Sequence, residues 1–280
     1  MKQFWSNNRF LILRRFTQIS ILVLYFGANA WGWTILRGNL SSSVIVNFAQ
    51  VSDPYAVLQM LAAGAVISLD LFIGAMTIAV FYFFVGGRAF CSWVCPINMV
   101  TDTANFIRRK LEFNRMQGAK MPLSRNIRYW VLGLSLIVSA IMGMAAFEFV
   151  SPISMIHRGL VFGIGFGWSS AVIIFLFDLF VLKDGWCGHI CPLGGFYSLI
   201  GRFSILRVRH FEENCTLCMK CKIVCPEHQV LHMIGKESLS VTDGACTNCA
   251  RCIDVCDDDA LEFSLRGLAE KIGEEYENDK

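Results

Sequence analysis

Eight cysteines near the end of the chain constrain its fold more than any other feature. They form two runs with the spacing C-x2-C-x2-C-x3-C, and 31 residues separate equivalent positions of the two runs. Three thiols at this spacing converge on one face of a cubane, while the fourth, on the turn that follows, points to the other cluster. The spacing therefore predicts two [4Fe–4S] clusters with crossed ligands: Cys215, Cys218, Cys221 and Cys256 for the first, and Cys225, Cys246, Cys249 and Cys252 for the second.

Zinc is the main alternative, because it also binds pairs of cysteines two residues apart. A zinc site needs two such pairs separated by a loop, whereas each run here has three thiols at x2 spacing and a fourth at x3. Iron–sulfur ligation is therefore the favoured interpretation. Pro226 follows the first run but Asp257 follows the second, and this departure predicts a looser turn after Cys256.

The rest of the chain is too apolar for an ordinary soluble domain. Of its 280 residues, 55% are hydrophobic and only 17% are charged, with a mean hydropathy of +0.50. Long uncharged runs of this kind indicate membrane spans. We expect four: Phe16–Leu36, Leu61–Val85, Ile127–Val150 and Leu160–Leu182. The first of these expected spans contains Ala28-Asn29-Ala30, which resembles a signal-peptidase site. The apolar segment continues beyond this site, however, and favours an uncleaved helix.

The sequence thus predicts a membrane protein in two parts. Residues 1–205 form an all-α domain of four transmembrane helices, built as a duplicated helix pair. Residues 206–265 form an α+β two-cluster ferredoxin domain of the bacterial type, and residues 266–280 form a polar tail. Because cytoplasmic thiols stay reduced, the cluster cysteines favour a domain that faces the cytoplasm.

Lysine and arginine predict the orientation in the membrane. The first 15 residues carry four and the stretch 86–128 carries eight, whereas the two opposite loops carry one each, Arg37 and Arg158. The positive-inside rule therefore predicts a multi-pass membrane protein with both termini and the ferredoxin domain in the cytoplasm.

An internal repeat supports the duplicated helix pair. Gly87–Pro96 and Gly185–Pro192 each contain a C-x3-C-P box after a pair of spans, with the thiols Cys91 and Cys95 in the first and Cys187 and Cys191 in the second. Residues four apart share a helix face, so each box offers a thiol pair. The four thiols fit an additional iron–sulfur cluster, a redox dithiol or a metal-delivery site, which we favour over simple packing beside helix-ending prolines.

Ionisable residues in or near the spans are candidates for a quinol and proton site. Asp70, Glu148 and His157 lie toward the outer side and Asp178 toward the inner side. Intramembrane carboxylates are costly and tend to mark proton or substrate paths. Pairing with arginine or backbone at a helix end explains each of them equally well when it is taken singly. His189, inside the second box, is better explained as a hydrogen-bonded structural residue.

Over nearly its whole length, the chain resembles the NapH family, the membrane-bound ferredoxin-type subunits of periplasmic nitrate reductase systems. The resemblance rests on the box Phe90-Cys-Ser-Trp-Val-Cys-Pro96, on the box Gly185-Trp-Cys-Gly-His-Ile-Cys-Pro192, on the four spans and on both cluster runs. It implies an electron-transfer subunit of a quinol-oxidising complex. Such a quinol dehydrogenase component would pass electrons, with a NapG-type ferredoxin partner, toward the periplasmic reductase. The eight ferredoxin cysteines carry over position by position, but no quinol site is assigned.

Two other classes of function remain open. Related membrane ferredoxins with C-x3-C-P boxes act in maturation of copper oxidases or in nitrous oxide reduction, although this chain lacks their large extra domains. Alternatively, the chain is a docking scaffold with redox-inert clusters. The lipid bilayer and quinol are the expected non-protein partners. Nothing in the sequence resembles a nucleotide-binding loop or a hydrolytic triad, and no nucleic-acid partner is expected.

Overall fold

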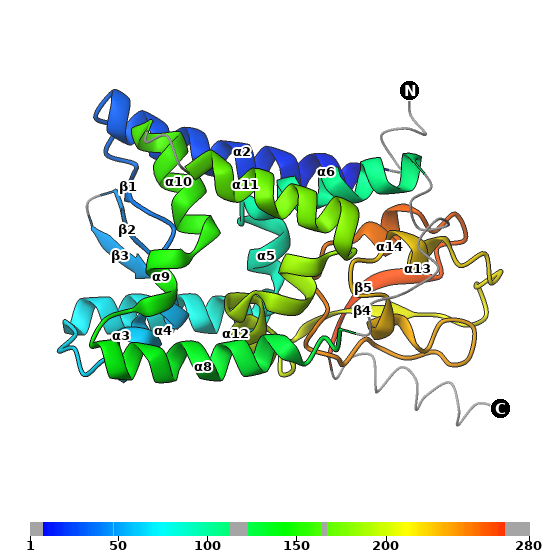
Figure 1. Cartoon of the computed structure of the whole chain (residues 1–280). Helices are drawn as coiled ribbons and strands as arrows, with labels where there is room; N and C mark the ends of the chain where they lie inside the picture. Colours follow the sequence, from blue (N-terminus) through cyan, green and yellow to red (C-terminus); the bar gives the residue numbers. More distant parts are fainter. Residues whose placement is uncertain (1–7, 47, 112–122, 164–166, 267–280) are drawn as a thin grey trace. The chain divides into compact units, whose positions relative to one another are not determined.

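The chain divides into two compact units, whose elements are labelled in Figure 1. The computed structural model describes residues 8–46, 48–111, 123–163 and 167–266. The ferredoxin unit consists of Met1–Phe16, Phe81–Trp93 and Tyr197–Lys280, and the helical unit of Thr17–Val80 and Val94–Phe196. The ferredoxin unit is thus larger than the segment 206–265 that the sequence indicated, and most of the expected tail lies outside the described residues.

The ferredoxin unit has the expected α+β character. Strands β4 (Leu206–His210) and β5 (Leu261–Leu265) pair antiparallel, with Val208 opposite Phe263. Between them lie the short helices α13 (Lys220–Val224), η3 (His228–Leu231) and α14 (Arg251–Asp254). One hydrophobic core joins these elements with the cluster cysteines, and its apolar members include Val208, Val230, Leu231, Val241 and Ile253.

The helical unit contains most of the remaining helices. They are α2 (Arg9–Ala30), α3 (Pro54–Ala62), α4 (Leu69–Val85), α6 (Ile97–Lys110), α8 (Ile127–Met142), α9 (Ala146–Val150), α10 (Pro152–Phe162), α11 (Gly167–Leu176), η1 (Phe177–Val181), η2 (Trp186–Ile190) and α12 (Pro192–Gly201). The unit boundaries fall within α2, α4 and α12, and α5 (Ala89–Trp93) belongs to the ferredoxin unit. Helix α3 packs against α8, and α11 packs against both α10 and α6.

A small sheet corrects the expectation that the first domain is all-α. Strands β1 (Leu36–Gly38), β2 (Ser42–Ile45) and β3 (Ala49–Ser52) form a three-stranded antiparallel meander. It lies almost entirely between the first and second expected spans, Phe16–Leu36 and Leu61–Val85. Gly38, with φ of 109°, lies at the β1–β2 turn, where Asn39 accepts hydrogen bonds from the amides of Ser41 and Ser42.

The helices are shorter than the apolar runs of the sequence. Of the described part, α2 is long and apolar enough to cross a membrane, while Leu69–Val85, Ile127–Met142 and Gly167–Val181 are shorter apolar helices. Gly64, Gly143 and Gly163 explain the difference, because all three have positive φ and end or follow the end of a helix inside or beside an expected span. The segment 151–159, between the third and fourth expected spans, is mostly helical, since Pro152 occupies the first position of α10.

The order of elements follows the repeat seen in the sequence. In each half, a long helix precedes a proline-initiated helix: α2 and then α3, or α8 and then α10. An apolar helix, a cysteine box and a second helix that begins at or just after a proline come next: α4 and α6 in the first half, α11 and α12 in the second.

Candidate iron–sulfur sites and the cysteine boxes

The two cysteine runs adopt the same backbone pattern. In each, the residues two and four positions after the first cysteine have positive φ, namely Leu217 and Met219 in the first run and Asn248 and Ala250 in the second. A short helix then carries the third cysteine. Alternation with left-handed residues turns successive backbone N–H groups toward one side and forms an anion-binding concavity. Both loops are therefore shaped to receive a negatively charged group.

Each predicted ligand set lines its own cavity. Cys225, Cys246, Cys249 and Cys252 line one, with Val208 and Leu231 among its apolar walls. The other is lined by Cys215, Cys218, Cys221 and Cys256, together with His210 and Ile234. In both cavities the fourth thiol comes from the other run, as crossed ligation requires.

The thiols fit iron–sulfur clusters in chemistry as well as in position. All twelve cysteines are free of disulfides, and soft thiolates are the ligands that such clusters take. Nowhere in the described residues do three His, Cys, Asp or Glu side chains converge on a point suited to a single metal ion. The four thiolates around a cubane bind four different iron atoms, so they need no such convergence.

The two cavities differ in exposure. Cys218 is exposed and Cys215 and Cys256 are partly exposed, whereas three of the four thiols of the second set are buried. Burial raises the pKa of the Cys246 thiol to about 11, and those of Cys225 and Cys252 well above the ordinary value. Metal binding must therefore displace protons from this second set.

A segment far away in the sequence holds the second cluster loop. The hydroxyl of Ser92 donates to the carbonyl of Thr247 at 2.7 Å, and the indole of Trp93 donates to the carbonyl of Asn248 at 3.1 Å. In return, the Asn248 amide donates to the carbonyl of Val85 at 2.9 Å. The turn that carries Cys91 is thus bonded to the loop that carries Cys246 and Cys249.

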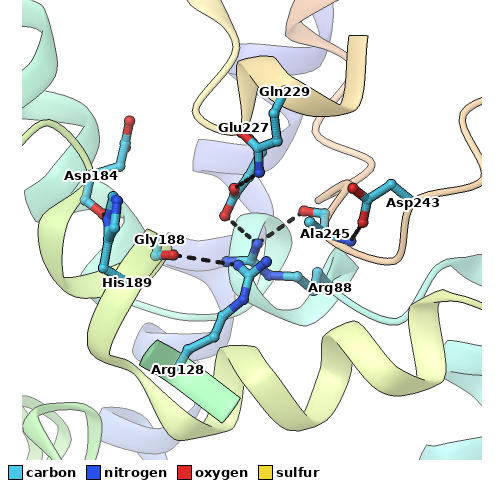
Figure 2. Close-up of polar contacts among 9 residues, drawn as sticks. All are labelled: Arg88, Arg128, Asp184, Gly188, His189, Glu227, Gln229, Asp243 and Ala245. Atoms are coloured by element: carbon cyan, nitrogen blue, oxygen red, sulfur yellow. Dashed lines mark hydrogen bonds and ion pairs between the residues drawn. The ribbon is translucent and has the colours of Figure 1, made fainter. Parts of the chain in front are cut away.

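Arg88 is the centre of this contact. Its guanidinium donates to a Glu227 carboxylate oxygen at 2.5 Å and to the carbonyl of Ala245 at 2.9 Å, as Figure 2 shows. The Gln229 amide donates to the other Glu227 oxygen, and Asp243 accepts from the amide of Ala245. Arg88 therefore joins the segment just after Cys225 to the residue just before Cys246. No local pattern in the sequence indicates this role of Arg88, because a basic residue after an apolar run indicates only a span end.

The boxes differ from the expected one-face geometry. Cys91 lies in α5, which ends at Trp93, and Cys187 lies in η2, which ends at Ile190. The second cysteine of each box therefore falls outside the helix that carries the first. Cys191 is extended, with φ of −62° and ψ of 113°, as expected for a residue before proline. The prolines begin the following helices and do not end the preceding ones.

The second box is tied into the helical unit by polar contacts. The Arg128 guanidinium donates to the carbonyl of Gly188 at 3.5 Å (Figure 2), and Asp178 accepts from the amide of Trp186 at 3.1 Å. His189 is buried with Nδ1 3.4 Å from the carbonyl of Asp184, in line with its interpretation as a structural residue. Asp178 likewise makes the backbone contact that the structural alternative predicted. Cys95, Cys187 and Cys191 belong to this unit and Cys91 to the other.

The structure brings together only part of the predicted quinol and proton site. One Glu148 oxygen accepts from the hydroxyls of Ser41 and Ser154, both at 2.5 Å. Ser154 lies one turn before His157 on α10, and the buried His157 ring packs edge-on against Tyr25 with 4.8 Å between centroids. Asp70 is exposed in the first turn of α4, and no contact in the described residues links it to the others.

Comparison with known proteins agrees with these features. The chain is 43% identical to "Ferredoxin-type protein NapH" of Haemophilus influenzae over 268 residues, 94% of this chain and 92% of the relative. It is 40% identical to the protein of the same name from Escherichia coli over 269 residues, 95% of this chain and 92% of the relative. This chain belongs to the NapH family.

This chain is also similar to proteins that carry a different name. The chain is also 43% identical to "Methylamine utilization ferredoxin-type protein MauN" of Methylorubrum extorquens over 258 residues, 91% of this chain and 88% of the relative. The family described as "4Fe-4S dicluster domain" matches residues 207–257, and the one described as "4Fe-4S binding domain" matches twice, at 67–114 and 164–211. No solved structure gives a significant match. The chain is thus a ferredoxin-type iron–sulfur electron-transfer protein.

Proposed function

We propose that this NapH-family protein is the inner-membrane component that takes electrons from quinol and passes them, through two [4Fe–4S] clusters, to a NapG-type partner on the way to a periplasmic nitrate reductase. The observation that carries the proposal is the pair of cavities, each lined by four thiols in the crossed arrangement. Oxidation of one quinol releases two electrons and two protons, and two bound clusters supply one-electron acceptors for both electrons.

Exposed apolar stripes support four membrane-spanning helices. On α8, Trp130, Leu134, Ile137 and Ile141 recur every three to four residues and expose 59–80% of their surface. Similar stripes lie on α2 (Leu13, Phe16, Ile19, Val23), on α4 (Leu69, Phe72, Ile73, Met76) and on α11 (Trp168, Val172, Ile173, Leu176). Soluble proteins rarely expose such surface, whereas lipid covers it without cost. The Lys and Arg distribution favours cytoplasmic termini.

The region around His157 is our candidate for quinol oxidation. Burial, and then the charge of Arg158, lower the pKa of His157 to about 4. The imidazole is therefore neutral at pH 7, and its two ring nitrogens have no partner in the described residues. A quinol hydroxyl could satisfy one of them and give up its proton there. Glu148 accepts a hydrogen bond from Ser154, which lies on the same helix as His157, and is the second candidate proton acceptor. Asp70 has less support.

The boxes are our candidates for the link between quinol and the soluble clusters. A helix of 20 residues is about 30 Å long, so electrons need an intermediate within the membrane part. Of the three uses open to the boxes, an additional cluster has the most support. Both segments that match the "4Fe-4S binding domain" family contain a box, and the box cysteines are the only cysteines in the sequence of these segments.

Reduction by quinol tests the proposal. The purified protein in lipid nanodiscs is mixed with a short-chain quinol, and cluster reduction is followed by EPR. We expect reduction in the wild type and its loss in Cys91→Ser or Cys187→Ser, with both ferredoxin clusters still reducible by dithionite. Wild-type rates in the variant lacking all four box thiols would show the boxes to be structural. No reduction of the wild type by any quinol would favour a scaffold or a maturation factor.

The similarity to MauN supports a second candidate, electron transfer in methylamine utilization. The two acceptor pathways are distinguished by complementation of strains that lack either relative. Restored growth on nitrate supports the first function, and restored growth on methylamine supports the second.

A further inference from the structure

Arg207 is a buried cation that no carboxylate of the described residues pairs with. It lies on β4 with 2% of its surface exposed. Its Nε donates to the carbonyl of Ser204 at 3.0 Å, and a terminal nitrogen donates to the carbonyl of Gly201. Both acceptors are neutral, and within the described residues Arg207 forms no ion pair. A buried guanidinium normally requires a negative charge nearby.

The surroundings of Arg207 indicate where that charge lies. Its neighbour Leu206 accepts a hydrogen bond from the Asn248 amide at 3.0 Å, and Gly201, whose carbonyl accepts from Arg207, lies against the backbone of Gly244, two residues before Cys246. Burial lowers the pKa of Arg207, and Cys246 is the strongest of the groups that oppose this effect. The cation therefore lies within electrostatic reach of the second cysteine set.

The two buried guanidinium groups near this set differ in their ion pairing. Arg88, the other buried guanidinium near Cys246, is neutralised by Glu227, and both side chains expose 2% of their surface. Asp243 is a weaker influence on Arg207 than Cys246. Among the described residues, Arg207 therefore has no ion-pair partner comparable to Glu227. Near the first set, by contrast, Lys220 pairs with Asp257 at 2.6 Å and both are more than half exposed.

We propose that Arg207 compensates the negative charge of the second [4Fe–4S] site and raises its reduction potential. An added electron makes a thiolate-bound cluster more negative, and a nearby buried cation stabilises that state most effectively where water cannot screen it. Arg207 acts as a positioning and charge-compensating residue and ligates no iron. The inference rests on the two-cluster assignment in the proposed function but does not depend on quinol as the donor.

Redox titration of variants tests this role. Arg207→Met removes the charge with similar length, Arg207→Lys retains it, and Arg202→Met removes an exposed charge five residues earlier in the same unit. Each holoprotein is titrated with dithionite and mediators and followed by EPR. We expect Arg207→Met to make the reduction potential of one ferredoxin cluster more negative. This should be the cluster whose EPR signal Cys225→Ser alters. Arg207→Lys should restore its potential, and Arg202→Met should leave both potentials unchanged.

Two results would overturn the proposal. One is unchanged potentials in Arg207→Met with full iron content. The other is equal loss of the second cluster in the Met and Lys variants, which would make the hydrogen bonds to Ser204 and Gly201 the essential feature. Loss in Met alone would support charge compensation. Because dithionite is the reductant, a wild-type protein inert toward quinol would refute the proposed donor and leave this test intact.

Discussion

Replacing Arg88 by methionine should destabilise the second cluster loop strongly. The variant removes a buried cation that is 2.5 Å from Glu227 and 2.9 Å from the carbonyl of Ala245. The Glu227 carboxylate would remain buried with its charge uncompensated. Breaking a buried ion pair in this way costs about 3–5 kcal/mol. At about 1.4 kcal/mol per factor of ten, local opening should become roughly a hundred to several thousand times more frequent.

Hydrogen exchange measured by mass spectrometry reads this opening directly. Peptides that cover residues 225–229 and 243–249 should exchange faster by the same factor in Arg88→Met, as long as reclosing is faster than exchange. Lys220→Met is the matched control, because its ion pair with Asp257 has nearly the same length but is exposed, and it should change exchange little. The double variant Arg88→Met/Glu227→Met removes both charges and leaves mainly the Ala245 carbonyl without its donor, which costs about 1–3 kcal/mol. The reasoning would be refuted if Arg88→Met changed exchange by less than about fivefold, or if the double variant opened more readily than the single one.

Three further predictions concern other parts of the chain. Because the pKa of His157 is lowered to about 4, the unfolded state binds a proton first as pH falls below 6.5. The free energy of unfolding should therefore drop by roughly 3 kcal/mol between pH 6.5 and 4. Thermal unfolding of wild type and His157→Leu over this pH range checks this, and an equal change of stability with pH in the two proteins would contradict it. Gly87→Ala places a Cβ against the Tyr197 carbonyl and should lower iron content, whereas Gly133→Ala, with open space around it, should not. Cysteines introduced at Ser42 and Ser154 should react with impermeant reagents from the periplasm; cytoplasmic labelling would contradict the four-span topology.

The cluster runs were the most predictable part of the chain because iron–sulfur chemistry fixes thiol spacing. Crossed ligand sets could be written from the sequence, and the structure gathers the same thiols around its cavities. The left-handed backbone at Leu217, Met219, Asn248 and Ala250 was not predictable, because none of these residues is glycine. The shape of the loop, and not the preference of its residues, imposes that conformation.

The helical unit was predicted less accurately because hydropathy reports composition and not helix ends. The apolar runs suggested unbroken helices, but glycines such as Gly64, Gly143 and Gly163 adopt positive φ and interrupt them. The sheet of residues 36–52 was missed because its strands are only three or four residues long. Arg88 and Glu227 are 139 positions apart, and no local pattern links residues at such a separation.

Crossed ligation is the central claim, and spectroscopy of serine variants tests it most directly. The two ferredoxin clusters should account for about eight iron atoms per chain, and a further cluster at the boxes would add to this number. EPR of the reduced protein should show that Cys256→Ser alters the same cluster signal as Cys218→Ser, and that Cys225→Ser alters the same signal as Cys249→Ser. If Cys256→Ser instead altered the signal affected by Cys249→Ser, and Cys225→Ser the one affected by Cys218→Ser, each run would hold its own cluster and the account would be wrong.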